Sequence, residues 1–181
     1  MQIFKGRSRS FFHFLCCLTL TSSMAQDVAQ MPKTGGESFA GRKVVLPDDA
    51  AGKVAVLIFG FSKASKVPTS AWSSKLLADF GTRPDFELYQ LPVLEDVPRF
   101  VRGLVIAGIR KGIPENRRAH FVPILQGEPE LKKFVRYSEP DDAYLAVLSP
   151  AGRVLELSHG TASDGNYARM REKIESVLTQ K

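Results

Sequence analysis

The feature that most constrains the fold is a run of six apolar residues, Val54-Ala55-Val56-Leu57-Ile58-Phe59. A strand that is apolar on both faces must be covered on both faces, so the run predicts a central strand with helices on each side. A shorter strand is predicted before it at residues 43–46, which end at the turn residues Pro47-Asp48-Asp49. After the run, residues 60–66 predict a loop.

The segment after this loop has the pattern of a helix followed by a second strand. Pro68 fits the first turn of a helix, where its missing backbone donor is no loss. Gly81 marks the end of this helix, whose apolar residues recur at helical spacing at Trp72, Leu76, Leu77 and Phe80. Residues 86–91 then alternate between two faces, as a strand does. With the run at residues 54–59, this pattern predicts a βαβ unit.

The middle of the chain predicts two more helices and an edge strand. Asp96 is a candidate cap for a helix with one apolar stripe, formed by Val97, Phe100, Val101, Leu104, Val105 and Ile109. Residues 120–125 predict a strand near the edge of the sheet, because Pro123 cannot donate a hydrogen bond to a neighbouring strand. A short helix is predicted over residues 130–136.

The C-terminal third predicts a hairpin and a last helix. The strand at residues 144–148 is followed by a turn, Ser149-Pro150-Ala151-Gly152, and by a returning strand at residues 154–157. The helix after the hairpin has Thr161 or Ser163 as its candidate cap. Its apolar residues lie three and four apart, at Tyr167, Met170, Ile174, Val177 and Leu178.

A βαβ unit followed by a hairpin and a final helix is the thioredoxin-like plan. The predicted fold class is α/β, a thioredoxin-like three-layer sandwich with a mixed sheet, a central βαβ unit and a C-terminal β-hairpin plus helix. Residues 41–47 and 52–59 resemble the opening of redoxin domains, and residues 144–154 resemble their closing hairpin.

A narrower resemblance covers Arg110-Lys111-Gly112-Ile113-Pro114-Glu115-Asn116-Arg117-Arg118 and, after them, Tyr144-Leu145-Ala146-Val147-Leu148 and Gly152-Arg153-Val154. This succession is similar to the mitochondrial F-type ATP synthase assembly factors that have a thioredoxin-like fold and lack redox cysteines. Those proteins tend to carry a Trp in the returning strand, where this chain has Leu155-Glu156-Leu157. The resemblance implies an assembly function without thiol chemistry.

The first 25 residues have the layout of a secretory signal peptide. The start is basic, with Lys5, Arg7 and Arg9, and an apolar run follows over residues 11–20. Small residues, with Ser23 two positions before Ala25, favour cleavage after Ala25. The expected domains are a signal peptide at 1–25, a flexible polar leader at 26–40 and a thioredoxin-like domain at 41–181. The expected location is exported, periplasmic or secreted, and a mitochondrial presequence is the alternative.

Removal of this segment changes the charge and the cysteine content. Three of the 25 basic residues leave with it, so 22 remain against 19 acidic residues, a net charge of +3 instead of +6. The remaining basicity predicts no nucleic-acid surface. The two cysteines, Cys16 and Cys17, also leave, so the processed chain would form no disulfide and offer no thiolate or Cys metal ligand. No integral membrane segment and no lipid anchor are expected after removal.

The loop after the central strand bears directly on redox chemistry. In thioredoxin-like enzymes it carries Cys-x-x-Cys or one peroxidatic Cys at the helix start, where the helix dipole lowers the pKa of the thiol. Here Ser62 and Ser65 have that spacing, with Lys63 and Lys66 beside them. A serine hydroxyl cannot run a dithiol cycle. We expect the two serines to cap the helix or to satisfy backbone groups of the loop, with a catalytic role as the alternative.

Other kinds of site have little support in the sequence. After residue 25 the chain has two histidines, His120 and His159, and no Gly-x-Ser-x-Gly motif, so neither a hydrolase site nor a His-rich metal site is predicted. No phosphate loop or dinucleotide turn is present, and no cofactor is predicted. Asp141-Asp142 is expected in a solvated turn. A cluster of basic residues is predicted to form either a solvated helix face or a patch that binds an acidic partner or an anionic lipid. Its members are Arg99, Arg102, Arg110, Lys111, Arg117 and Arg118.

The predicted function is that of an exported, redox-inactive binding or assembly module with a chaperone-like role. Its expected partner is a polypeptide client or a membrane protein complex. The alternative is a redoxin-superfamily enzyme, either a thiol-disulfide oxidoreductase or a peroxiredoxin-like protein, that has lost or replaced its cysteines.

The candidate binding site is a groove between the loops at residues 62–68 and 140–144, where an extended peptide would pair its backbone. Trp72 is its candidate apolar anchor, unless both loops are solvated turns and Trp72 belongs to the core. The full set of candidate groove residues is Ser62, Lys63, Ser65, Lys66, Trp72, Asp141, Asp142 and Tyr144.

Overall fold

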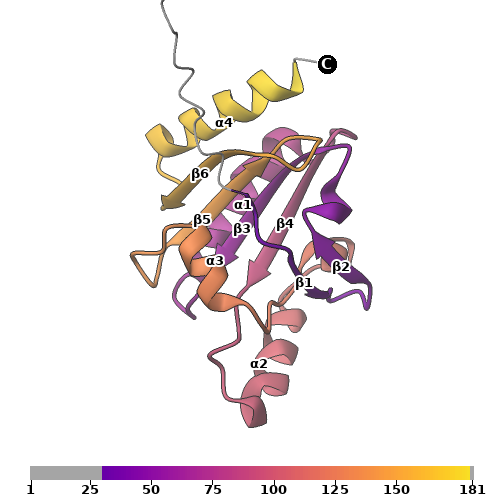
Figure 1. Ribbon diagram of the computed structural model, residues 1–181, viewed down its shortest axis with the longest axis vertical. Helices are drawn as coiled ribbons and strands as arrows, with labels where there is room; N and C mark the ends of the chain where they lie inside the picture. The colour runs from indigo at the N-terminus through magenta and orange to yellow at the C-terminus, as the bar shows by residue number, and fades with distance from the viewer. Residues whose placement is uncertain (1–29, 180–181) are drawn as a thin grey trace, which may run out of the picture.

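The structure is a computed structural model, and it describes residues 30–179. The expected signal peptide at residues 1–25 and its cleavage site lie outside the described residues. Within them, the main sheet has four strands in the order β4-β3-β5-β6 (Figure 1). None of the helices between residues 30 and 179 is both long enough and apolar enough to cross a membrane.

The central strand of the sheet is β3 (Val54–Gly60), whose first six residues are all buried. β4 (Phe86–Pro92) pairs with it in parallel, and β5 (Ala143–Leu148) pairs with it antiparallel on the other side. β6 (Val154–Gly160) returns beside β5 and forms one edge of the sheet. The mixed sheet, the βαβ unit and the closing hairpin are therefore as predicted.

Alternate residues of β3 pack into two separate cores, one on each face of the sheet. Ile58 lies in the core beneath α1 (Lys66–Phe80) and α4 (Asp164–Leu178). Leu57 lies in the other core, beneath α3 (Glu128–Phe134). Figure 1 shows α1 and α3 on opposite sides of the sheet. The predicted three layers are confirmed, because a strand buried on both faces needs cover on both.

A small antiparallel ribbon adds to the cover on the α3 side, and its first strand lies where the sequence predicted part of a flexible leader. β1 (Thr34–Glu37) pairs with β2 (Lys43–Leu46). Gly35 favoured flexibility in the sequence, yet a Cβ at this position would collide with the backbone oxygen of Val44. The glycine therefore serves the close approach of two strands. Phe39 is also buried and stacks on Phe121, with ring centroids 6.0 Å apart.

Two predictions for the middle of the chain need correction. α2 (Arg99–Lys111) begins directly after Pro98, so Asp96 does not cap it, and none of its residues is buried. The segment predicted as a strand at 120–125 makes only two isolated bridges beside the main sheet, Gln90↔Phe121 and Val93↔Ile124. Pro123 stands between these bridges and has no amide hydrogen to donate. The segment follows a short 3-10 helix, η2 (Glu115–His120), and a second one, η1 (Asp48–Ala50), follows β2.

The last helix begins as one of the two predicted caps requires. Ser163 is the N-cap of α4, and its hydroxyl accepts a hydrogen bond from the amide of Asn166 at 3.4 Å. Thr161 contributes its backbone oxygen instead, which accepts from the side-chain amide of Asn166 at 3.1 Å.

Candidate functional site

Two loops and the end of a strand meet at one end of the sheet because of the strand register. Gly60 at the end of β3 lies opposite Ala143 at the start of β5, and Ala143 lies opposite Gly160 at the end of β6. The loop after β3, the loop before β5 and the last residues of β6 are thereby brought side by side. Residues at 61–65, 139–142 and 159–160, far apart in the sequence, form this end of the molecule. We call it the β3–β5 loop site.

The two serines in the first loop bond to each other's backbone. The Ser65 amide donates to Ser62 Oγ at 3.0 Å, and Ser65 Oγ donates to the Ser62 carbonyl oxygen at 2.7 Å. Ser65 precedes α1 and is 1% exposed, but its side chain makes no capping hydrogen bond to the helix. Of the two roles expected for these serines, the structure shows the second, which is to satisfy backbone groups of the loop.

A hydrogen bond joins this loop to the next one. Ser62 Oγ donates to Asp141 Oδ1 at 2.7 Å. The neighbouring Asp142 turns to a different partner, with its Oδ2 2.8 Å from His159 Nδ1 on β6. Adjacent carboxylates thus tie the middle loop to both of its neighbours. The expectation of a merely solvated turn at Asp141-Asp142 is corrected by these two contacts.

The two bonds do not combine into a hydrolytic triad. Ser62 is bonded to Asp141, whereas His159 is bonded to Asp142, so the imidazole is not the base that faces the serine hydroxyl. A Ser–His–Asp relay requires the histidine to accept the proton of the nucleophile. Between residues 30 and 179 there is also no group of three His, Cys, Asp or Glu side chains placed to hold a metal ion.

Two of the expected groove residues are part of the core. Tyr144 is fully buried between Tyr137 and His159, with both ring centroids 5.5 Å away. Its hydroxyl accepts hydrogen bonds from the amides of Ser138 and Glu139 at 2.9 and 2.8 Å, so it fixes the backbone of the loop before β5. The prediction that Tyr144 lines an open groove is corrected, because its side chain has no exposed surface.

Trp72 is also fully buried, on the inner face of α1. Its indole Nε1 donates to the Gly160 carbonyl oxygen at 2.9 Å, which fixes the end of β6 to α1. Gly160 has a φ of 103°, a conformation that other residues adopt only with strain. The interpretation of Trp72 as a surface anchor is therefore corrected in favour of the core alternative. Lys63 and Lys66, by contrast, are exposed and form no ion pair within the described part of the chain.

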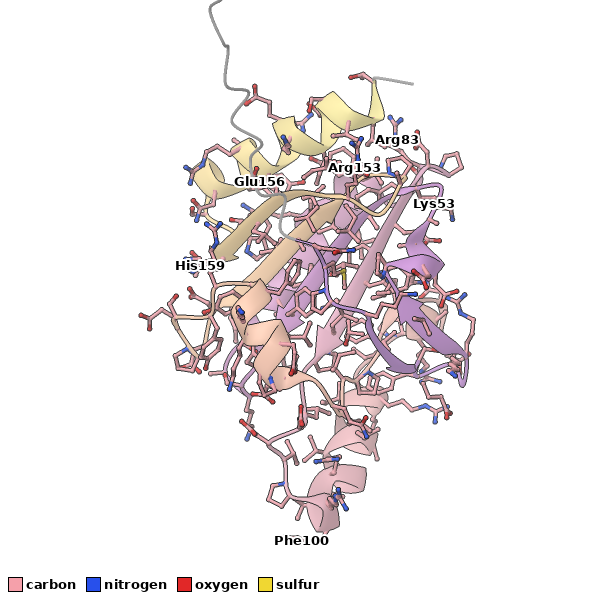
Figure 2. All side chains as sticks on the ribbon, viewed as in Figure 1. Lys53, Arg83, Phe100, Arg153, Glu156 and His159 are labelled. Atoms are coloured by element: carbon pink, nitrogen blue, oxygen red, sulfur yellow. The ribbon has the colours of Figure 1, made fainter. Side chains whose placement is uncertain are left out.

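A hollow between β6 and α4 adjoins the loop site and was not anticipated from the sequence. Its volume is about 640 Å³. It is lined from β6 by Glu156, Leu157 and His159, and from α4 by Asn166, Arg169 and Lys173, among others. Figure 2 shows Glu156 and His159 at separate points along β6, below α4. His159 belongs to both features, so the hollow opens beside the loop site.

No local sequence motif indicates this hollow, because its position depends on how β5 and β6 pair in the hairpin. β6 pairs only with β5 and leaves its outer backbone edge unpaired within the sheet. An unpaired edge is a template for an added strand. His159 falls opposite Tyr144 in this register, which also explains its contact with Asp142 two residues earlier.

A separate polar cluster surrounds Glu87 on β4. Lys53 Nζ donates to Glu87 Oε1 at 2.6 Å, the Tyr89 hydroxyl donates to Oε2 at 2.8 Å, and His120 Nε2 lies 4.0 Å away. The neighbouring His120 is the main influence that lowers the pKa of Glu87 to about 2. Lys53 and Tyr89 act in the same direction, and burial opposes them. The cluster links β4 to the turn before β3 and to η2, and it is distant in the sheet register from the loop site.

Comparison with known proteins bears on the fold. No family model matches the chain, and no curated protein matches it. The solved structure of BsSco, of the Sco family of cytochrome c oxidase assembly proteins, is similar with a TM-score of 0.57 and 15% identity, covering 84% of this chain and 95% of that one. The exposed lipoprotein thioredoxin of Streptococcus pneumoniae matches with a TM-score of 0.55 and 14% identity, over 78% and 99% of the two chains.

A third structure, a thiol-disulfide oxidoreductase of Bacteroides fragilis, has a TM-score of 0.52 and 14% identity, over 79% of this chain and 98% of that one. Each match spans almost the whole of the solved chain. The predicted thioredoxin-like fold is confirmed by these likenesses. At such identities, function does not follow from the shared fold.

Proposed function

We propose that this chain is an exported, redox-inactive binding or assembly module that holds a polypeptide client beside the β3–β5 loop site. The client would be an extended segment of another protein, in the manner of a chaperone. No cofactor is required for this role. The proposal rests on the loop after β3, where redox enzymes of this fold hold their reactive cysteines.

In this chain the loop is closed by hydrogen bonds rather than prepared for chemistry. Ser65 is buried and bonded to Ser62, and Ser62 is bonded in turn to Asp141. A thiol enzyme needs an accessible sulfur at this place, with a lowered pKa. The only cysteines of the chain, Cys16 and Cys17, stand in the segment interpreted as a signal peptide. The loop therefore supports a structural role in shaping a binding face.

The hollow beside β6 supports a polypeptide as the client. An extended segment would pair its backbone with the open edge of β6 and lay alternate side chains into the hollow. Arg169 and Lys173 from α4 and Glu156 from β6 line it, so it offers charges of both signs. Leu157 and Met170 add apolar surface to the same lining. Such a mixture suits a peptide better than a small apolar ligand.

Two further observations support an exported location and an assembly role. The matched solved proteins include one described as an exposed lipoprotein and one from a family of assembly proteins, which agrees with an exported assembly role. The resemblance of residues 110–118 and 144–154 to F-type ATP synthase assembly factors points to a subunit of a membrane protein complex as the client. This narrower identification is part of the proposal.

The experiment is site-specific photo-crosslinking. A photo-reactive amino acid replaces Glu156, which is exposed and lines the hollow. The matched control replaces Glu130, which is exposed on α3, on the opposite face of the sheet. After irradiation in an envelope extract of the native source, we expect a discrete crosslinked polypeptide from position 156 and none from position 130. Equal crosslinking from both positions would contradict the proposed site.

The alternative, a redoxin-superfamily enzyme with replaced cysteines, is tested in parallel. Purified protein is assayed for reduction of insulin disulfides and for consumption of hydrogen peroxide. We expect no rate above that of buffer. A rate that disappears on replacement of Ser62 alone would favour the enzyme and contradict a binding module.

A further inference from the structure

α2 turns part of its apolar surface toward solvent. Phe100 is 89% exposed and Leu104 is 77% exposed. They are two of the three large apolar side chains that are exposed in the described part of the chain; the third is Val67 on α1. Figure 1 shows α2 extending past the end of the sheet, and Figure 2 shows Phe100 at its far end. The predicted apolar stripe is therefore covered only in part: Val97, Val101, Val105 and Ile109 are half-buried, whereas the described chain leaves Phe100 and Leu104 exposed.

The helix carries its exposed apolar residues and two of its basic residues on different sides of its axis. At about 100° per residue, Phe100 and Leu104 fall on one side, and Arg99 and Arg110 fall together on another. Lys111 falls on the side of Phe100, but at the opposite end of the helix. α2 contains four basic residues, Arg99, Arg102, Arg110 and Lys111, and no acidic one. This is the pattern of a helix that lies in an interface between a charged and an apolar medium.

The basic residues near α2 divide into two groups. Arg102, Arg117 and Arg118 donate to backbone carbonyls, for example Arg102 to Glu95 and Val97 at 2.7 and 2.9 Å, so they hold the surrounding loops. The remaining three are exposed and form no ion pair with a described residue. These free cations, Arg99, Arg110 and Lys111, are available for an external anion.

The composition of α2 is poorly suited to an isolated helix in water. Gly103 and Gly108 both face open space, so neither is needed for close packing. Each glycine costs a helix about 1 kcal/mol relative to alanine. A helix of this length gains most of its stability from burial of an apolar face. Burial of Phe100 and Leu104 against another surface would add to the stability that the half-buried residues of α2 already supply.

We propose that α2 is an interfacial helix that docks the domain onto an anionic lipid bilayer. Phe100 and Leu104 would enter the boundary of the acyl chains, while Arg99, Arg110 and Lys111 would contact negatively charged headgroups. The charge of α2 selects this occupant, because a helix with three free cations and no anion complements a negative surface. With 13 residues, α2 lies on a membrane and does not span it, since about 20 are needed to cross.

Docking through α2 also orients the molecule. β3 and β4 are parallel and end in register, with Gly60 opposite Pro92. The chain runs from Pro92 toward α2, and the β3–β5 loop site follows Gly60, so both lie at the same end of the sheet. A domain held by α2 therefore turns the loop site toward the membrane. This inference stands on α2 alone and remains valid if the proposed function is wrong.

The test is vesicle co-sedimentation with a chain that begins at Gln26. This chain keeps all the described residues, including both cores of the sheet, and lacks the apolar run at residues 11–20, which would bind lipid by itself. Vesicles contain phosphatidylcholine alone or phosphatidylcholine with an equal amount of phosphatidylglycerol. We expect binding to the anionic vesicles, weakened by added salt, and little binding to the neutral ones.

Two double variants separate the contributions. F100Q with L104Q should lower the partition coefficient at least about tenfold, because two apolar side chains no longer enter the bilayer. R110E with K111E should lower it by about tenfold or more at low salt. The matched controls are V67Q, an exposed apolar residue on α1, and K43E with R153E, an equal change of charge at exposed residues outside both α2 and the β3–β5 loop site. Neither control should change the partition coefficient more than about twofold.

A fluorescence measurement locates the contact. F100W adds an exposed indole to a chain whose one tryptophan, Trp72, is fully buried. Anionic vesicles should shift its emission to shorter wavelength, and brominated lipids should quench it. Absence of binding to anionic vesicles, or binding that the F100Q and L104Q pair leaves intact, would overturn the proposal. Loss of self-association in that pair, without any vesicle binding by the parent chain, would overturn it in favour of a second copy as the occupant.

Discussion

Ser62 Oγ donates to Asp141 Oδ1 at 2.7 Å across 79 residues of sequence. The bond closes the space between the loop after β3 and the loop before β5. Together with the Ser65 amide that donates to Ser62 Oγ, it makes one hydroxyl the centre of a small network. The network explains how a loop with the spacing of a redox motif is stable without sulfur.

The first prediction concerns these serines. Ser62→Ala removes the bond to Asp141 and the acceptor of the Ser65 amide, so the free energy of unfolding should fall by about 1 kcal/mol. Ser65→Ala should cost about 1 to 2 kcal/mol, because the hydroxyl is buried and bonded. Urea denaturation measures both effects. Crosslinking through position 156 should persist in both variants, and its loss in the Ser62 variant alone would show that the Ser62 hydroxyl takes part in client binding.

The second prediction tests the central strand. Ile58 is 1% exposed in the core beneath α1 and α4. Ile58→Asp should lower the free energy of unfolding by about 3 kcal/mol or more, because it buries an unpaired charge. Val67→Asp, at a 75% exposed position, is the matched control and should change stability little. A folded and equally stable Ile58→Asp chain would show that β3 is not central.

The third prediction concerns acid stability through Glu87. Its pKa in the folded chain is about 2, below its ordinary value of 4.5, so folding favours the ionised carboxylate. The stability that follows is fully present above about pH 4.5 and is lost as the pH falls toward 2. We expect Glu87→Gln to be less stable than the parent chain at pH 7 and to lose less stability between pH 5 and pH 2.5, a range that covers most of this window. Thermal unfolding across this range measures the difference, and equal pH slopes would contradict it.

The fourth prediction concerns export, which no described residue tests. The basic start, the apolar run at residues 11–20 and the small residues Ser23 and Ala25 predict cleavage after Ala25. Mass spectrometry of the protein from its native source should find an N-terminus at Gln26. An intact N-terminus on folded cytosolic protein would contradict export. A terminus at a different place within an organelle fraction would favour the mitochondrial alternative.

Much of the fold could be predicted because its signals are local. The apolar run of β3, the spacing around Trp72 in α1 and the turn before β6 each reflect a few neighbouring residues. The position of α2 could not be predicted, because a stripe at helical spacing shows that a face is apolar but not that the chain covers it. The leader was misjudged for a similar reason, since Gly35 favours flexibility locally yet allows close strand pairing in the fold.

The candidate site also has residues that the sequence could identify and residues whose positions it could not predict. The serine spacing identified Ser62 and Ser65, and the acidic pair identified Asp141 and Asp142, because each is a short motif. The role of His159 depends on the register of β5 and β6, which the sequence alone does not specify. Trp72 and Tyr144 were placed in the groove although both are buried, because proximity to a loop does not determine the direction of an aromatic side chain.

The last prediction concerns the two exposed lysines beside the serines. Lys63 in the β3–β5 loop site and Lys66 directly after it have no ion-pair partners in the described chain, so their charge is available to a client. K63E with K66E should weaken client capture severalfold at low salt and little at high salt, because exposed charges act at long range and are screened. The matched control, K43E with K133E, changes two exposed lysines on other elements and should leave capture unchanged. Crosslinking yield through position 156 at two salt concentrations measures both pairs. An equal loss in the control pair would mean that net charge, rather than the loop site, governs capture.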